Sequence, residues 1–206
     1  SYAALAGIGN TLLTIISVAL GVMVVVAIRL AGDAAAGSFR SSLESLEGPA
    51  TLEITAAGGM DERLLGKLVV LPYPLEFTPR IQAFARLTAT SQTVPVFGLD
   101  VIANSFAQSE YRPQSEQKLS EAVFCSEALR CRVGDPLSMI LNDRRKTYRV
   151  AGELPGTDPF LILDIGEAQA ATGRSGRLDS IQVRTPAGSE VDYSAILREA
   201  LPAGIE

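Results

Sequence analysis

Two cysteines and two aspartates are the residues of this chain whose types and spacing could do chemistry. The 206 residues include no His, which excludes Ser-His-Asp and Cys-His catalysis and His-ligated metal sites. Cys125 and Cys131 are six positions apart. If both lay on one helix, their Cα atoms would be about 9 Å apart by helical rise alone, which is too far for a disulfide. We interpret them as buried or unreactive thiols, because two cysteines without His are a poor zinc site and Cys125 has no evident base.

The two aspartates could form an acid–base pair, but each has a local structural explanation. Asp135 lies in a predicted Gly-Asp-Pro turn, and Asp164 precedes a predicted helix as its N-cap. The glycines of the first ten residues and the Gly58-Gly59 pair lack the Lys and the spacing of a phosphate-binding loop. We therefore expect no catalytic residue, no metal site and no cofactor, and we do not expect an enzyme.

One basic cluster stands out, formed by Arg144-Arg145-Lys146 and Arg149. We interpret it as the solvated edge of a β-hairpin, where Lys and Arg discourage pairing with another strand. Contact with anionic lipid or with a partner is the alternative. The net charge is −5, from 23 acidic and 18 basic residues, so nucleic acid is not an expected partner.

The elements that must position these residues begin with an uncharged stretch. Every Asp, Glu, Lys and Arg lies at position 29 or later. Within residues 12–30 only Thr14, Ser17 and Arg29 are polar, and a bilayer core of about 30 Å needs roughly 20 apolar residues. The pattern predicts a transmembrane helix within residues 1–32, surrounded by membrane lipid, with Arg29 at the far interface.

Small residues within this helix, namely Thr14, Ser17 and Gly21, are expected to pack closely against partner membrane helices. A secretory signal peptide and a buried core helix are the alternatives. The apolar run is longer than the roughly 7–15 residues of a signal peptide, and no basic segment precedes it. Nothing else in the chain is hydrophobic enough to surround a buried helix. The membrane helix is therefore favoured.

The helix is expected to continue beyond the membrane as a stalk over residues 33–48. Phe39, Leu43 and Leu46 recur at spacings of four and three, which is helical periodicity, and we expect them to carry the stalk. Gly48-Pro49 is a strong stop signal. One continuous helix over residues 11–47 is therefore predicted.

Residues 49–206 are predicted to form an α+β domain that could divide into two lobes. Strand patterns occupy residues 51–55, 82–90, 93–101, 122–125, 137–141, 146–152, 160–163 and 181–185. Helices are expected over residues 62–70, 127–132, 165–172 and 193–201. Asp61, Asp164 and Asp192 are the expected caps, and Glu167 completes a capping box with Asp164. Gly58-Gly59 is read as a break, Asn142-Asp143 as a hairpin turn, and residues 103–117 as a polar loop.

Several segments, taken in order, resemble FtsX/MacB-type ABC transporter permeases. The opening run LTIISVALGV at residues 13–22 resembles the first membrane helix of that family, followed by a run like residues 39–48 and a strand like residues 51–55. The further matching segments are VFGLD (96–100), SEAL (126–129), VGDPL (133–137), YRVAG (148–152), ILDI (162–165) with AQ (168–169), and GRLDSI (176–181). The resemblance covers residues 12–206, with 103–118 unmatched.

This resemblance implies a fragment of a permease subunit in the bacterial cytoplasmic membrane, with its core domain on the extracytoplasmic side. It implies a cytoplasmic ATP-binding subunit as a partner, whose hydrolysis the stalk couples to transport or mechanical work, and a second permease copy or paralogue. A lipoprotein, a lipid or an efflux substrate would fit such a role. A single-pass, membrane-anchored ligand-binding or sensor domain is the alternative, and an anchored hydrolase is a third class.

Overall fold

The computed structural model describes residues 19–24, 26, 52–102, 119–186, 188–189 and 191–205. These residues belong to two units, divided between residues 41 and 42, and each unit is described by itself. In the first unit, residues 19–24 and 26 are helical with exposed side chains. No helix within the described residues is long and apolar enough to span a membrane. The predicted membrane helix, the stalk and the loop at 103–117 lie largely or wholly outside the described residues.

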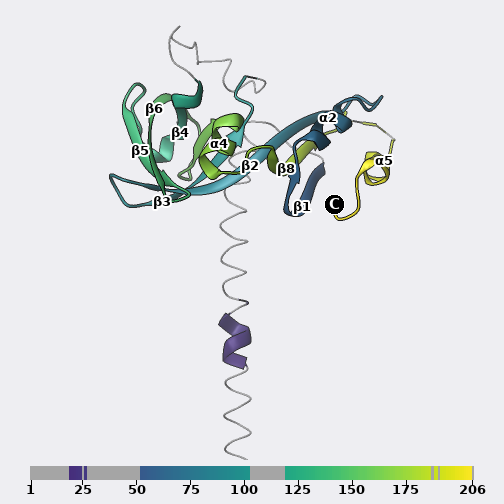
Figure 1. The fold of residues 1–206 in the computed structure, drawn as a ribbon, viewed down its shortest axis with the longest axis horizontal. Helices are drawn as coiled ribbons and strands as arrows, with labels where there is room; N and C mark the ends of the chain where they lie inside the picture. Colours follow the sequence, from purple (N-terminus) through teal and green to yellow (C-terminus); the bar gives the residue numbers. More distant parts are fainter. Residues whose placement is uncertain are drawn as a thin grey trace, which may run out of the picture. The chain divides into compact units, whose positions relative to one another are not determined.

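The second unit is a mixed α+β domain, as expected, in which the described strands form one eight-stranded sheet (Figure 1). Their order across the sheet is β1-β8-β2-β3-β7-β4-β6-β5. The strands are β1 (Leu52–Asp61), β2 (Glu76–Leu87), β3 (Thr93–Leu99), β4 (Ala122–Ser126), β5 (Pro136–Leu141), β6 (Arg144–Leu154), β7 (Leu161–Asp164) and β8 (Arg177–Arg184). The helices are α2 (Arg63–Val69), α4 (Ile165–Thr172) and α5 (Tyr193–Ala200), with short 3₁₀ turns η1 (Leu119–Glu121) and η2 (Glu127–Leu129).

Six of these strands close into a ring, which we call the barrel section. The second half of β2 pairs with β3, which pairs with β7, then β4, β6 and β5. The ring closes because β5 returns to β2, with Ala85 opposite Leu141 and Leu87 opposite Met139. β4 is buried along its whole length and β7 along most of its length, as expected of short apolar strands with neighbours on both sides.

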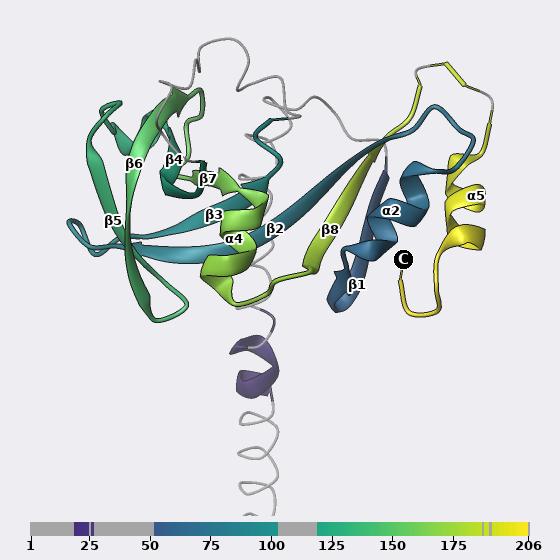
Figure 2. The same cartoon turned by 45° about the horizontal axis from the view of Figure 1, so that its top comes forward.

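The remaining strands and two of the helices form what we call the open section. The first half of β2 pairs with β8, and β8 pairs with β1, so these three strands form an antiparallel sheet. α2 and α5 lie beside this sheet, at the opposite end of β2 from the barrel section (Figure 2). One continuous apolar core includes residues of both sections. A division of the domain into two lobes therefore stays a prediction.

Local signals correctly placed several turns and helix ends. Asn142 and Asp143, with φ of 48° and 59°, make the predicted hairpin turn between β5 and β6. Asp164 caps α4 by accepting a hydrogen bond from Gly166 N, and Gly173 ends the helix with φ of 71°. Asp192 caps α5 by accepting from Ser194 N and Ala195 N.

Other local predictions were wrong, or wrong in extent. Gly58 and Gly59 do not end the first strand; with φ of 81° and 79° they form an irregularity inside β1. Glu62 is the N-cap of α2 and makes no capping hydrogen bond with its side chain, while the expected cap Asp61 accepts from Arg63 N at 2.8 Å. β2 begins at Glu76, six residues earlier than expected, because its first half pairs with β8.

The helix predicted over residues 127–132 was also wrong. The chain forms only the single turn η2, and Arg130 then takes a left-handed conformation with φ of 51°. A left-handed residue ends a helical turn, because it reverses the direction of the backbone. This correction decides the state of the two cysteines.

Candidate functional site

Cys125 and Cys131 form a disulfide, which corrects the interpretation of free thiols. Cys125 is fully buried in β4, and Cys131 follows the left-handed Arg130. The turn at Arg130 brings the two Cα atoms to 6.3 Å, within the range that a disulfide spans. The error came from judging the pair on one unbroken helix, whereas the chain turns at Arg130 between the two cysteines. A six-residue spacing across a strand end was the signal that could have indicated the bond.

A groove of about 570 Å³ adjoins this disulfide, at the end of the barrel section. The β2–β3 turn forms one wall, and the segment from η2 to β5 forms the other. Arg130 and Arg132 stand on the second wall as exposed side chains, and Asp135 is the acidic residue of the lining. The full lining is Leu87, Thr88, Ala89, Thr90, Leu129, Arg130, Cys131, Arg132, Asp135, Pro136, Leu137, Ser138 and Val150. The groove therefore offers guanidinium groups and no nucleophile–base pair.

The basic cluster at residues 144–149 begins on a strand edge, which is consistent with the interpretation from sequence. Within the described residues, Arg144, Arg145 and Lys146 on β6 pair with β5 alone. Arg149 pairs with Pro136 on β5 and with Ala122 on β4. Protection of an edge therefore fits the first three residues and does not explain Arg149.

One member of the cluster, Lys146, has a structural role. Its Nζ lies 2.6 Å from Glu167 Oε1, and the hydroxyl of Tyr148 donates to the same oxygen at 2.7 Å. Glu167 and Tyr148 are buried, and burial together with this hydrogen bond raises the pKa of the Tyr148 hydroxyl far above its usual range. The three side chains tie β6 to α4. Glu167, expected in a capping box, thus bonds β6 through its carboxylate, which local spacing could not reveal.

The two aspartates considered as a catalytic pair serve different elements. Asp135 lies in the turn before β5, where its backbone C=O accepts from Val150 N at 2.9 Å. Asp164 lies at the junction of β7 and α4. Desolvation by burial, with a smaller contribution from the nearby Asp100 carboxylate, raises the pKa of Asp164, although backbone hydrogen bonds oppose the shift. Each aspartate has the structural role that the sequence predicted, a turn and a helix cap.

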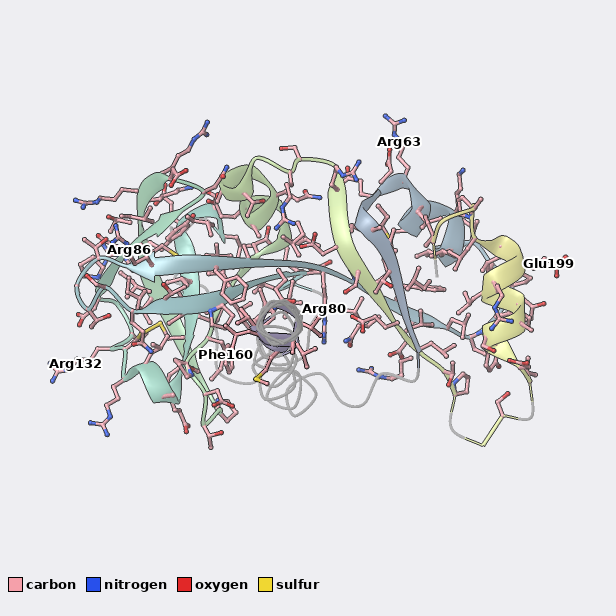
Figure 3. The ribbon with its side chains drawn as sticks, turned by 90° about the horizontal axis from the view of Figure 1, so that it is seen from below. Arg63, Arg80, Arg86, Arg132, Phe160 and Glu199 are labelled. Carbon is pink, nitrogen blue, oxygen red and sulfur yellow. A yellow bond between two sulfur atoms is a disulfide. The ribbon has the colours of Figure 1, made fainter. Side chains whose placement is uncertain are left out.

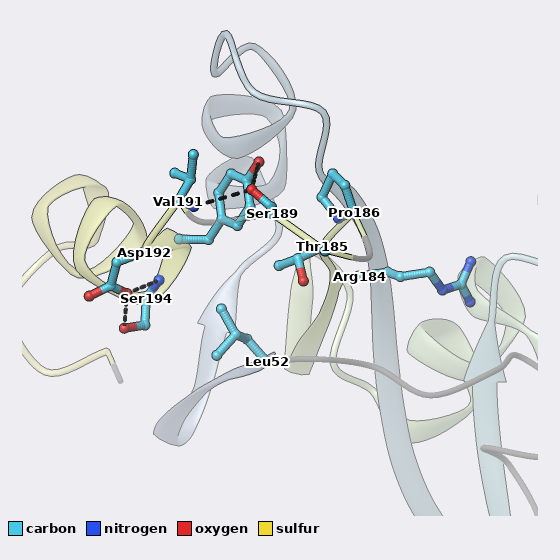
Figure 4. A pocket seen from close by; sticks show the side chains of 10 residues that line it. Leu52, Arg184, Thr185, Pro186, Ser189, Val191, Asp192 and Ser194 are labelled. Atoms are coloured by element: carbon cyan, nitrogen blue, oxygen red, sulfur yellow. Dashed lines mark hydrogen bonds between the residues drawn. The ribbon is translucent and has the colours of Figure 1, made fainter.

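A second hollow, of about 590 Å³, lies in the open section where β8 leads into α5. Figure 4 shows hydrogen bonds among the polar groups of residues 189–194. Ser189 Oγ lies 3.2 Å from the Tyr193 hydroxyl, and Asp192 Oδ1 accepts from Ser194 Oγ at 2.6 Å. These side chains fix the start of α5, so this hollow presents little polar chemistry to a ligand.

Most residues predicted for membrane packing and for the stalk lie outside the described residues. These are Thr14, Ser17, Phe39, Leu43 and Leu46. Gly21 is a helical residue, and apart from its own helix backbone a Cβ added there would meet no atom of the described residues within 4 Å. Among the described residues no cluster of Cys, Asp and Glu could hold a metal ion.

Comparison with known proteins is consistent with the sequence resemblance. The family model of the MacB-like periplasmic core domain matches residues 11–199. No curated protein sequence matches the chain. Its fold is similar to the crystal structure of the periplasmic region of MacB from Actinobacillus actinomycetemcomitans, at 16% identity and a TM-score of 0.51, over 78% of this chain and 86% of that one.

A second similar structure is the extracellular domain of YknZ, a noncanonic ABC-type transporter from Gram-positive bacteria. The identity is 10% and the TM-score is 0.51, over 75% of this chain and 97% of that one. At these identities the likeness concerns the fold.

Proposed function

Since the chain belongs to the family of MacB-like periplasmic core domains, which are parts of ABC transporter permeases, we propose that it couples ATP hydrolysis by a cytoplasmic partner subunit to work in the cell envelope. The observation that carries this proposal is the match of the family model to residues 11–199. The match begins within the uncharged N-terminal stretch and extends almost to the end of α5. The work would be transport, or force transmitted to another envelope protein.

The proposal includes an anchor. Residues 1–32 would cross the cytoplasmic membrane and residues 33–48 would form the stalk, so that the domain after residue 48 works outside. The charge distribution supports this arrangement, because the first charged residue is Arg29. Thr14, Ser17 and Gly21 would then pack against other membrane helices of the permease.

The disulfide supports an extracytoplasmic position. Disulfides persist in oxidising compartments and are rare in the bacterial cytoplasm. Cys125 and Cys131 join the end of β4 to the groove wall, which fits a domain exposed to the periplasm or the cell exterior. Topology fusions test this point. Alkaline phosphatase fused after residue 206 should be active and a green fluorescent protein there dark, whereas the fluorescent protein before Ser1 should be bright.

The same fusions separate the anchor from its alternatives. A membrane helix predicts an uncut protein that resists extraction with alkaline carbonate. A cleaved signal peptide would give a shorter, extractable product, and a buried core helix would leave both reporters on one side of the membrane. Either result would reject the proposed anchor.

Coupling can be tested in the permease that contains this chain, purified in nanodiscs with its ATP-binding subunit. Spin labels at the exposed Thr88, one in each of two permease copies, should give a distance that changes with ATP. Leu43→Pro should abolish that change and leave ATP hydrolysis, because proline breaks the stalk helix. Ser45→Ala, at a neighbouring position, is the matched control. An unchanged response in Leu43→Pro would contradict force transmission, and failure to purify with an ATP-binding subunit would favour the anchored-sensor alternative.

A further inference from the structure

We propose that the outer wall of the barrel section is a docking surface for an acidic protein segment. Its residues, called here the arginine surface, are Arg86, Arg130, Arg132, Arg145 and Arg149. All five are exposed and come from β2, β6 and the segment between η2 and β5. Figure 3 labels Arg86 and Arg132 at the barrel end of the domain, and Arg63 and Glu199 at the other end.

Strand register brings these side chains onto one wall. Arg86 on β2 lies opposite Ile140 on β5, and Ile140 lies opposite Arg145 on β6. Their neighbours Ala85, Leu87, Met139 and Leu141 are buried, so the alternation of a strand directs Arg86 and Arg145 outward. Arg149 follows Arg145 by four residues on the same strand, and therefore lies on the same face.

The wall continues into the groove beside the disulfide. Arg149 lies opposite Pro136 in the ladder, and Pro136 also lines the groove with Arg130 and Arg132. The disulfide holds the segment that carries these two arginines against β4. The positive charge of the wall and that of the groove thus form one surface.

Within the part of the domain that the structure describes, the charges of this surface are not neutralised by ion pairs. Among the described residues, no ion pair involves any of the five arginines. Arg149 donates to Gly134 O at 2.8 Å, which fixes its position and leaves its charge. In contrast, Arg174 and Arg184 of the open section are bound to Asp179 and Glu76. Arg86 and Arg149 lie on strand segments that are paired on both sides, so protection of a strand edge does not explain these two residues.

The spacing and chemistry favour carboxylates spread along a polypeptide. Arg86 and Arg145 are separated by two strand spacings, or about 10 Å, and Arg145 and Arg149 by about 13 Å along the strand. No single phosphate can bridge such distances. An extended segment with an acidic side chain at every second residue carries carboxylates about 7 Å apart on one face, so alternate carboxylates match the spacing of about 13 Å along β6. The planar guanidinium pairs with carboxylates in two hydrogen bonds.

Apolar neighbours favour a protein over a lipid surface. Phe84, two residues before Arg86 and thus on the same face of β2, is 59% exposed. Arginine and exposed aromatic residues together are typical of protein–protein interfaces.

The test uses the full 206-residue chain in a mild detergent and a fluorescent 20-residue peptide of alternating Glu and Thr. We expect binding with a Kd of tens to hundreds of micromolar that weakens as salt is raised, and no binding of the Gln-Thr counterpart. Arg86→Glu with Arg145→Glu should weaken binding at least tenfold. Arg63→Glu with Lys67→Glu, on the exposed face of α2, makes the same change in net charge and should leave Kd within twofold.

Three outcomes would overturn the proposal. An equal loss of peptide affinity in both double-Glu variants would show that the net charge of the chain alone is responsible for binding. Binding of phosphatidylglycerol vesicles in the absence of peptide binding would assign the surface to lipid. Wild-type peptide binding by the double variant Arg86→Gln with Arg145→Gln would show that these arginines do not form the docking surface. The circular dichroism spectrum and melting temperature of this variant should match those of the wild type.

Discussion

The barrel section and the open section use arginine in opposite ways. In the open section, Arg174 Nη1 lies 2.6 Å from Asp179 Oδ1, and its Nη2 donates to Gln82 O on β2 at 2.7 Å. Arg177 donates to Gly58 O and Gly59 O, at the irregularity of β1. In the barrel section, Arg86 projects from a strand that is paired on both sides, and Arg145 from the part of β6 that pairs with β5 alone.

The difference follows from how each section satisfies the hydrogen-bonding groups of its backbone. An irregular strand such as β1 leaves carbonyl groups without ladder partners, and arginine side chains supply the missing donors. A closed ring satisfies its backbone groups within the ladder, so the outward side chains are available for other contacts. Arginine in the open section therefore stabilises the fold, whereas arginine on the barrel wall can serve binding. The following predictions test this comparison, in order of decreasing effect.

The largest contrast is expected from the same substitution in the two sections. An added Cβ at Gly98 in β3 would collide with Ala168 of α4 and lie 3.2 Å from Ile81 Cβ. Gly98→Ala should lower the free energy of unfolding by about 3 kcal/mol, because neither neighbour is a flexible side-chain end. A Cβ at Gly66 in α2 meets nothing within 4 Å, so Gly66→Ala should raise the free energy by about 0.5–1 kcal/mol. Urea unfolding measures both, and equal effects would contradict the tight packing of α4.

Removal of the disulfide should affect the barrel section alone. Cys125→Ala with Cys131→Ala should lower the free energy of unfolding by about 2 kcal/mol, as expected for a loop of this length. Amide hydrogen exchange should become faster in β4 and in the groove wall, and remain unchanged in β1 and β8. Dithiothreitol should destabilise the wild type by a similar amount and leave the double variant unaffected. Faster exchange throughout the domain would show that the effect is not local.

Substitution of one arginine in each section compares the stabilising role in the open section with the proposed binding role on the barrel wall. Arg174→Ala should cost about 1 kcal/mol, since it removes an ion pair and a hydrogen bond that join β8 to β2, both partly exposed to solvent. Arg86→Ala should change the free energy of unfolding by less than about 0.5 kcal/mol. Chemical denaturation of the two variants gives the comparison. A cost at Arg86 as large as that at Arg174 would mean that the barrel arginines also stabilise the fold.

The smallest effect concerns the charge at the cap of α4. Asp164→Ala should cost about 1 kcal/mol by loss of the cap, whereas Asp164→Asn should change the free energy by less than about 0.5 kcal/mol at neutral pH. The pKa of Asp164 is raised in the folded state, so the ionised carboxyl is disfavoured there. As pH falls through that raised pKa toward the ordinary value of 3.8, the wild type should gain stability relative to Asp164→Asn. A relative loss of wild-type stability over this range would contradict the direction of the shift.

Prediction from sequence succeeded where a few neighbouring residues decide the structure. The caps Asp164 and Asp192 and the turn at Asn142-Asp143 depend on contacts within about four residues, and all were confirmed. The helix predicted over residues 127–132 failed locally at Arg130, and other errors arose where distant segments decide. The early start of β2 depends on β8, about one hundred residues away in the chain, and the role of Glu167 depends on β6.

The sequence by itself determined the charge asymmetry of the chain, the α+β class, the local caps and turns, and the order of segments that resembles the family. Each of these properties follows from composition or from the spacing of residues close together in the chain. Tertiary structure alone decided that β5 returns to β2, that Cys125 meets Cys131, and that five arginines share one exposed surface. Strand pairing and side-chain burial are set by the lowest free energy of the whole chain, and a one-residue change of register would turn every side chain to the other face.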